Sequence, residues 1–217
     1  MERPIQDILN YVDHTALSRS ATEEDIIRLC DEANKVQAAS VCVPPYYVAL
    51  ARKCVKGGVK VCTVIGFPNG YNTTAAKVFE TEDAIREGAG EIDMVINNNM
   101  LKNGDVEGVL SEIRALKKAC GDRVLKVIVE TCLLTEEEKR TMCRVVTEAG
   151  ADYIKTSTGF EKAGATIEDV RLMRANVGKA VKVKAAGGIR SVESAAAFLD
   201  AGADRIGASA VIKEYLK

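Results

Sequence analysis

Short β-rich runs alternate with helical segments along the whole chain, and this alternation limits the possible folds more than any other feature of the sequence. Three helix starts are marked by a threonine followed three residues later by an acidic residue, which can satisfy the free amides of a first turn. These threonines are Thr22, Thr135 and Thr166. Further helices are expected from Pro44-Pro45 to Gly57-Gly58, over 73–87, 104–120 and 191–201, and from residue 209.

Eight β-rich runs lie between these helices, at 11–15, 40–43, 59–65, 91–96, 124–130, 152–156, 181–185 and 205–207. Strands that alternate with single helices form βαβ units and a parallel sheet. Eight units in 217 residues predict a small closed (β/α)8 TIM barrel, with a short helical segment at its N-terminus. The main alternative is a doubly wound open sheet, but no dinucleotide-type glycine fingerprint follows the first strand. Because no linker-like stretch interrupts the pattern, 1–217 is expected to be a single domain.

Composition excludes several classes of partner. Apolar residues make up 47% of the chain and the formal net charge is -1, which argues against nucleic acid or membrane held by bulk charge. No apolar stretch approaches the roughly 20 residues of a membrane helix, and no signal-like segment is present, so a cytoplasmic location is expected. The seven cysteines contain no C-x-x-C pair, which favours reduced thiols over disulfides or structural zinc.

Strand periodicity places several charged side chains inside the predicted barrel. In the run 181–185 the valines alternate with Lys182 and Lys184, so both lysines are expected to point inward. The same alternation in the neighbouring strands places Lys126 and Asp93 on inward faces. One buried lysine is readily explained by a structural ion pair. Several lysines beside one acid favour a functional site, because perturbed titratable groups gather at such sites.

A short internal repeat adds Lys155 to this group. The stretches EGAGEIDMV, EAGADYIKT and DAGADRIGA each end a helix and begin a strand. In each stretch one glycine ends the helix. The residues five positions after that glycine are, in chain order, Asp93, Lys155 and Gly207. Alternate strands contribute to one layer of a barrel interior. Asp93 and Lys155 are therefore expected to share a layer in which Gly207 leaves an opening.

The ends of the last three predicted strands indicate a phosphate pocket. Glycines and hydroxyl side chains follow these strands at 156–159, 185–188 and 207–209. Glycines let backbone amides approach an anion, hydroxyls donate to it, and a helix N-terminus favours negative charge. Barrels commonly hold phosphate at the loops after strands seven and eight.

A lysine beside phosphate-binding loops, without a nucleotide motif, suggests imine chemistry on a phosphorylated carbonyl compound. An uncharged lysine attacks the aldehyde, and a carbon–carbon bond breaks or forms through an enamine. A second charged lysine nearby would favour the uncharged form of the first. Asp93 is placed to move the protons.

The motifs that carry this chemistry resemble those of the deoxyribose-phosphate aldolases, a class I, Schiff-base family. The resemblance runs through DHTAL (13–17), VCVPP (41–45), VIGFPNG (64–70), EIDMVIN (91–97), LKVIVET (125–131), DYIKTSTGF (152–160), VKAAGGIR (183–190) and RIGAS (205–209). It implies a (β/α)8 barrel that reversibly cleaves 2-deoxy-D-ribose 5-phosphate to D-glyceraldehyde 3-phosphate and acetaldehyde, in deoxyribonucleotide catabolism. It also implies that no metal or organic cofactor is needed.

The resemblance assigns roles to individual residues. Lys155 would form the Schiff base, Lys184 would be the second catalytic lysine, and Asp93 would transfer protons with an ordered water. Lys126 would be a further active-site lysine with an electrostatic role. The remaining residues expected at the substrate are Asp13, Thr15 and Cys42 along the sugar, and Thr158, Gly159, Gly187, Gly188 and Ser209 at the phosphate.

Two residues depart from the pattern of some relatives. Phe160 stands where a lysine can follow the glycine, and Ala210 where a second serine can stand; both changes remove side-chain donors for phosphate. Tyr215 lies within a helical pattern, so it is not assigned the role of the C-terminal tyrosine of some relatives. The only histidine, His14, is interpreted as structural, because it falls on the strand face opposite its two neighbours.

Two other functions stay open at this point. One is a phosphate-binding barrel isomerase in which the lysines act only through their charge. The other is a non-catalytic barrel that binds a sugar phosphate. In each reading the partners are small phosphorylated molecules, and because the family is often dimeric, a homodimer is expected.

Overall fold

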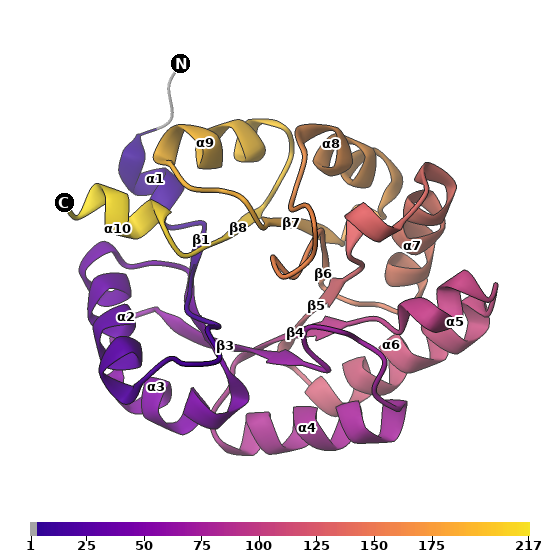
Figure 1. Cartoon of the computed structure of the whole chain (residues 1–217), viewed down its shortest axis with the longest axis horizontal. Helices are drawn as coiled ribbons and strands as arrows, with labels where there is room; N and C mark the ends of the chain where they lie inside the picture. The colour runs from indigo at the N-terminus through magenta and orange to yellow at the C-terminus, as the bar shows by residue number, and fades with distance from the viewer. Residues whose placement is uncertain (1–3) are drawn as a thin grey trace.

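The computed structural model describes residues 4–217, and its eight parallel strands close into a barrel in chain order (Figure 1). The strands are β1 (Val12–Thr15), β2 (Ser40–Val43), β3 (Lys60–Ile65), β4 (Glu91–Val95), β5 (Val124–Ile128), β6 (Tyr153–Lys155), β7 (Lys182–Ala186) and β8 (Arg205–Ala208). β1 pairs with both β2 and β8, which closes the sheet. The predicted TIM barrel is confirmed, and the open doubly wound sheet is excluded.

The helices form a ring outside the strands (Figure 1). They are α1 (Ile5–Leu9), α2 (Glu23–Val36), η1 (Pro45–Tyr47), α3 (Val48–Cys54), α4 (Thr74–Arg86), α5 (Asn98–Lys102), α6 (Val106–Cys120), η2 (Thr131–Leu133), α7 (Glu136–Glu148), α8 (Ile167–Asn176), α9 (Val192–Asp200) and α10 (Val211–Tyr215), where η denotes a 3-10 helix. α1 is the expected N-terminal helical segment, and it lies beside α9.

The three helix caps read from the sequence are present. Thr22 and Thr135 each accept a hydrogen bond from the backbone amide three residues on, and the acid at that position bonds back to the cap amide. Thr166 accepts from the amide of Asp169 at 3.0 Å, but the Asp169 carboxylate instead binds Lys139 Nζ at 2.5 Å. Because of this ion pair, the Asp169 carboxylate does not bond back to the Thr166 amide, as the acids after Thr22 and Thr135 do at their own caps.

The helix expected after Pro44 is shorter than predicted. Pro45 begins the 3-10 turn η1, and α3 ends at Cys54. Val55 already has an extended backbone, with φ -71° and ψ 146°. The chain therefore leaves the helix three residues before Gly58, and the two glycines lie in the following turn.

The apolar core lies between the strands and the ring of helices. Strand residues that point outward are fully buried against the helices, among them Ile92, Leu125, Val127, Ile154 and Val183. The alternate residues point into the barrel, where register aligns Asp93 with Lys126 and Lys155 with Lys184 on neighbouring strands. The fold thus brings charged residues from distant parts of the chain into one interior.

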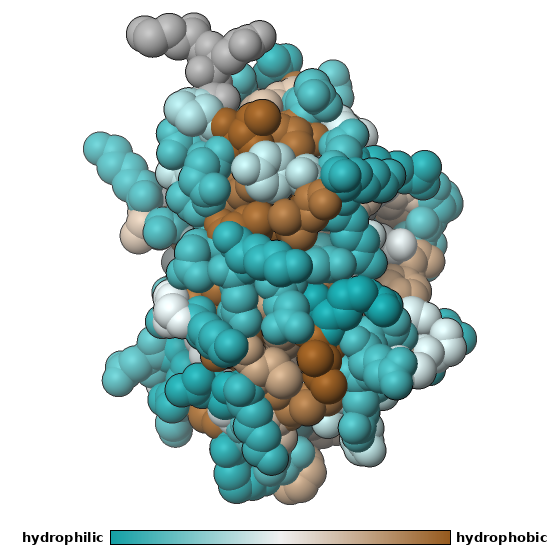
Figure 2. Space-filling view, turned by 90° about the vertical axis from the view of Figure 1, so that its left-hand side faces the viewer, coloured by the Kyte–Doolittle hydropathy of each residue, from teal (hydrophilic) through white to brown (hydrophobic). Residues whose placement is uncertain are grey.

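One side of the barrel is covered mainly by hydrophilic side chains, with hydrophobic ones in separate groups (Figure 2). Among residues 4–217, no helix has both the length and the apolar character that a membrane crossing requires.

Candidate active site

Asp93 is the centre of a buried cluster of charges inside the barrel. Its Oδ2 lies 2.8 Å from Lys155 Nζ and 2.7 Å from Lys184 Nζ, and its Oδ1 lies 2.8 Å from Lys126 Nζ. The four side chains come from β4, β5, β6 and β7, and each is at most 4% exposed. One carboxylate therefore contacts three lysines, all of which the sequence placed inside the barrel.

Gly207 on β8 makes room for this cluster. A Cβ atom at this position would lie 3.1 Å from Lys184 Cε and 2.9 Å from the Cβ of Ala186. Both distances are tighter than ordinary contacts, so any larger residue would displace Lys184 from Asp93 or open the barrel. The opening expected at Gly207 is thus the space that the Lys184 side chain uses.

A second layer of charges supports the first. Asp13 on β1 accepts from Lys184 Nζ at 2.5 Å and from Arg205 at 2.6 Å. Glu91 lies 2.7 Å from Lys126 Nζ and 3.0 Å from Arg205 Nη1. Arg205 was not predicted from the sequence. The alternation of β8 could have found it, since Arg205 and Gly207 share a face.

Each charge in the cluster is stabilised by its neighbours. Burial alone would raise the pKa of Asp93, but Lys126, Lys155 and Lys184 outweigh it and hold the pKa well below its usual value. Burial would likewise lower the pKa of Lys184, but Asp13 and Asp93 raise it above the usual lysine value. Asp93 is therefore anionic and Lys184 cationic at neutral pH.

Lys182 does not join the cluster, and the prediction that both lysines of β7 point into the interior is wrong for it. Lys182 is exposed, and its Nζ lies 5.7 Å from the centre of the Tyr153 ring. It is the first residue of β7 and stands at the amino-terminal mouth of the barrel, where an ammonium group can reach solvent.

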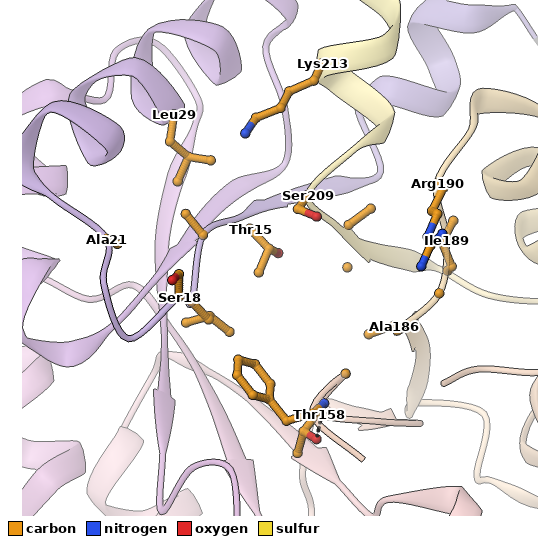
Figure 3. Close-up of a pocket in the computed structure, with 18 of the residues that line it drawn as sticks. Thr15, Ser18, Ala21, Leu29, Thr158, Ala186, Ile189, Arg190, Ser209 and Lys213 are labelled. Atoms are coloured by element: carbon orange, nitrogen blue, oxygen red, sulfur yellow. Dashed lines mark hydrogen bonds between the residues drawn. The ribbon is translucent and has the colours of Figure 1, made fainter. Parts of the chain in front are cut away.

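A cavity of about 560 Å³ opens at the carboxyl ends of the strands (Figure 3). Of the predicted site residues it is lined by Thr15, Lys155, Thr158, Gly159, Gly187, Gly188 and Ser209. Within the cluster Lys155 alone reaches this lining, while Asp93, Lys126 and Lys184 are buried behind it. An aldehyde entering the cavity would therefore meet one lysine amine.

Asp13, Lys126 and Cys42 do not line the cavity. Asp13 and Lys126 are fully buried, and Cys42 is 1% exposed in a small cluster with Cys62. The Cys62 thiol lies 3.2 Å from Asp93 Oδ1. Asp13 contacts Lys184 and Lys126 contacts Asp93, and the expected contact of Asp13, Lys126 and Cys42 with substrate stays a prediction.

Two groups of side chains bring together ligand atoms of the kind that bind metals. They are Cys42 with Cys62 and Asp93, and Asp13 with Cys62 and Glu91. Lys126 Nζ lies 3.3 Å from Cys62 Sγ and 2.8 Å from Asp93 Oδ1. The Lys126 ammonium group therefore supplies the positive charge between these sulfur and oxygen atoms. The atoms bind the lysine as they would bind a metal ion.

Thr158 is held by Glu130, which directly follows β5. The Thr158 backbone amide donates to Glu130 Oε2 at 3.1 Å, and the Thr158 hydroxyl donates to the same oxygen. Phe160 N in turn donates to Thr158 Oγ1 at 3.1 Å. Burial raises the pKa of Glu130, opposed by these Thr158 bonds. The expected Thr158 hydroxyl donor to phosphate is therefore already bound within the protein.

Five further lining residues carry charge and were not predicted: Asp25, Arg28, Glu32, Arg190 and Lys213. Arg190 follows the glycine loop after β7, and Lys213 extends from α10 over the cavity near Ser209 (Figure 3). The position of Arg190 within VKAAGGIR was a usable signal. Arg28, Glu32 and Lys213 lie on helices, where no strand periodicity marks the direction of the side chain.

His14 has the structural environment expected for it. It is fully buried, and its Nε2 lies 2.6 Å from Glu32 Oε2. Burial lowers the pKa of His14, and the pairing with Glu32 opposes that effect. The imidazole thus fixes Glu32 at the wall of the cavity and does not line the cavity itself.

Comparisons with known proteins point to one kind of enzyme. The family model described as DeoC/LacD family aldolase matches residues 8–217. The deoxyribose-phosphate aldolase of Clostridioides difficile (strain 630) is 55% identical to this chain over 209 residues, 96% of this chain and 95% of that protein. The solved structure of QR15, an aldolase, is 42% identical with a TM-score of 0.93, covering 97% of this chain and 96% of QR15. The tetrameric deoxyribose phosphate aldolase from Aeropyrum pernix is 33% identical with a TM-score of 0.87, covering 99% and 93%.

Proposed function

The chain belongs to the DeoC/LacD family of aldolases, and we propose that it reversibly cleaves 2-deoxy-D-ribose 5-phosphate to D-glyceraldehyde 3-phosphate and acetaldehyde through a Schiff base on Lys155. The carrying observation is that Lys155 lines the cavity while its Nζ lies 2.8 Å from an anionic Asp93. A nucleophile and a proton acceptor thus stand together at the floor of a site open to substrate.

The reaction follows from this placement. Uncharged Lys155 Nζ adds to the C1 aldehyde of the open-chain sugar, and loss of one water leaves an iminium ion. The C3 hydroxyl gives up its proton, its oxygen becomes the carbonyl of glyceraldehyde 3-phosphate, and the electron pair of the C2–C3 bond passes into an enamine. Protonation at C2 and hydrolysis release acetaldehyde and restore the lysine.

Asp93 and Lys184 supply the proton transfers. Asp93 Oδ2 contacts both Lys155 Nζ and Lys184 Nζ, so a proton taken up by the carboxylate can be passed to or from either amine. Lys184 keeps its charge because Asp13 and Asp93 raise its pKa. Its fixed ammonium group also stabilises the negative charge that develops on the departing hydroxyl oxygen as the carbinolamine loses water.

The phosphate is proposed to lie at the loops after β6, β7 and β8. Gly159 and Gly187 have φ of 84° and 88°, a left-handed conformation that favours glycine. The Gly159 Cα lies 3.4 Å from the place that a Cβ on Gly187 would occupy, so side chains there would fill the cavity wall. Backbone amides, Ser209 and Arg190 are among the donors then available for the anion.

The enzyme is further proposed to act in the cytoplasm on phosphorylated sugars and aldehydes, in the breakdown of deoxyribonucleotides. A homodimer remains the expected assembly. The Aeropyrum pernix relative is described as a tetramer, so light scattering at working concentration would decide between the two states for this chain.

Trapping of the imine tests the proposal directly. Incubation with acetaldehyde and borohydride is expected to leave an ethyl group on Lys155, found by peptide mass spectrometry. Lys182, which is exposed at the opposite mouth, is the internal control for unspecific alkylation. Folded protein in which Lys155 is modified no faster than Lys182 would show that the lysine has no covalent role, as in an isomerase or a sugar-phosphate binder.

A further inference from the structure

The start of α10 places two polar side chains at the rim of the cavity. Ser209 directly follows β8, and Lys213 stands four residues later in α10. Both line the cavity, and Lys213 extends from α10 into the space above Ser209 and Thr15 (Figure 3).

Most charges of the cavity wall are already paired. Arg28 binds Asp25, and Glu32 binds His14 at 2.6 Å. Lys155 binds Asp93 behind the wall.

The two remaining cations of the lining are Arg190 and Lys213. Within residues 4–217 neither of them forms an ion pair or a side-chain hydrogen bond. The rim between β7 and α10 therefore carries two positive charges without an anionic partner in the described part of the chain.

The charge of Lys213 already acts across this rim. Burial is the main cause that lowers the pKa of His14, and the ammonium group of Lys213 lowers it further. His14 precedes Thr15 at the end of β1. The Lys213 ammonium group thus lies near the carboxyl end of β1.

Other side-chain donors at this end of the cavity are scarce. The Thr158 hydroxyl donates to Glu130, and Phe160 packs edge-on against Phe67 with ring centres 5.2 Å apart. Ala210, the cap residue of α10, offers no hydroxyl. A phosphate dianion needs charged or polar partners to replace the water that it loses. Lys213 is the flexible cation placed to meet it.

We propose that Lys213 is a specificity-determining residue that binds the phosphate of the substrate from α10, opposite Arg190. This inference rests on the proposed function, because it assumes a phosphorylated aldehyde substrate on Lys155. It adds that selectivity for the phosphorylated over the free sugar depends on an ammonium group from the last helix. The group is exposed, so it can swing onto the anion after the sugar has entered.

The test compares two sugars in one variant. In Lys213→Met, kcat/KM for 2-deoxyribose 5-phosphate should fall about tenfold, mainly through KM, as expected when one charge-assisted contact to an anion is lost. The ratio of kcat/KM for the phosphorylated sugar to that for free 2-deoxyribose should fall by the same factor. Lys213→Arg, which keeps the charge, should retain most of that ratio.

Lys118→Met is the matched control, because it removes one exposed lysine on α6 that does not line the cavity. It should leave the ratio unchanged. An equal loss on both sugars in Lys213→Met, or no loss on either, would overturn the inference.

A measurement without turnover separates this inference from the proposed function. Titration of wild type and Lys213→Met with inorganic phosphate, followed by calorimetry, should show weaker binding in the variant. Unlabelled Lys155 in the borohydride experiment would refute the aldolase mechanism while leaving the phosphate titration to decide the role of Lys213. Equal phosphate affinity in both proteins would refute the role of Lys213 even if Lys155 is labelled.

Discussion

Asp93 makes the lysine cluster possible at the scale of single residues. A buried ammonium without a partner is strongly unfavourable, yet Lys126 and Lys184 are fully buried. Both contact Asp93, and each has a second acid, Glu91 for Lys126 and Asp13 for Lys184. Lys155 has Asp93 alone as its anionic partner among the described residues. The reactive amine is therefore the least tightly held of the three.

Replacing Lys184 by Leu should keep the fold and lower kcat at least about 100-fold, the usual effect of removing a group that transfers protons. Asp13 keeps Arg205 as a partner and Asp93 keeps Lys126, so the remaining acids stay paired. Circular dichroism checks the fold and the coupled aldolase assay measures kcat.

Lys182→Leu is the matched control for this change, since it alters the same strand at its exposed end. Its kcat should stay near that of wild type. A kcat for Lys184→Leu within about twofold of wild type would contradict the role of Lys184 in proton transfer.

Residues on strands could be predicted because a strand has a period of two. Asp93, Lys126 and Lys184 were found in this way, and the internal repeat added Lys155. The same count failed for Lys182, because periodicity tells which face a side chain is on but not how far along the barrel it lies. Lys182 is the first residue of β7, so its side chain lies at the amino-terminal mouth of the barrel and not in the barrel interior.

At the scale of elements, the junction after β5 controls the loop that follows β6. Glu130 has a left-handed backbone, with φ 59° and ψ 69°, which is uncommon for a residue other than glycine. This turn places its carboxylate against Thr158 N and Oγ1. Such unusual backbone positions are kept where the surroundings require them. Here the requirement is a fixed position for Thr158 and Gly159 in the cavity wall.

Removal of this carboxylate should therefore affect substrate binding more than chemistry. In Glu130→Ala the loop 157–160 loses both hydrogen bonds, and KM for the phosphorylated sugar should rise about tenfold, with a smaller change in kcat. Glu130→Gln keeps an acceptor oxygen and should restore KM to within about threefold. Steady-state kinetics on both variants measures the changes in KM and in kcat separately.

Acetaldehyde labelling of Lys155 provides the control for this variant, because the small aldehyde does not need the phosphate loop. Labelling should proceed in Glu130→Ala at the wild-type rate. A loss of labelling together with an unchanged KM would mean that Glu130 supports Lys155 and not the loop.

At the scale of the whole molecule, the barrel could be read from the sequence while the rim of its cavity could not. Eight units and the cap residues at Thr22 and Thr135 follow local rules, so each part of the chain carries its own signal. The rim forms only when loops and helices after different strands meet. Lys213 and Arg28 reach the cavity from α10 and α2, and this meeting depends on closure of the barrel.

Closure also joins the charges of the barrel interior into one unit that should determine acid stability. Burial raises the pKa of Asp13, but Lys184, Arg205 and Lys126 outweigh burial and hold the pKa well below the usual value of 3.8. Asp93 is shifted in the same direction. A carboxylate with a depressed folded-state pKa contributes stability that is complete above its unfolded pKa and is lost as the pH falls below it.

Asp13→Asn should therefore be less stable than wild type by about 3 kcal/mol at pH 7, because a buried ion pair loses one partner. Below about pH 4 the gap should close by about 1.4 kcal/mol per pH unit, since the unfolded wild type then takes up a proton that the folded state refuses. Urea unfolding of both proteins between pH 3 and pH 7 measures the difference. Asp83→Asn, which removes an exposed acid paired with Arg86 on α4, should follow wild type throughout. A gap between Asp13→Asn and wild type that is the same at every pH would show that Asp13 stabilises the barrel through packing and not through its charge.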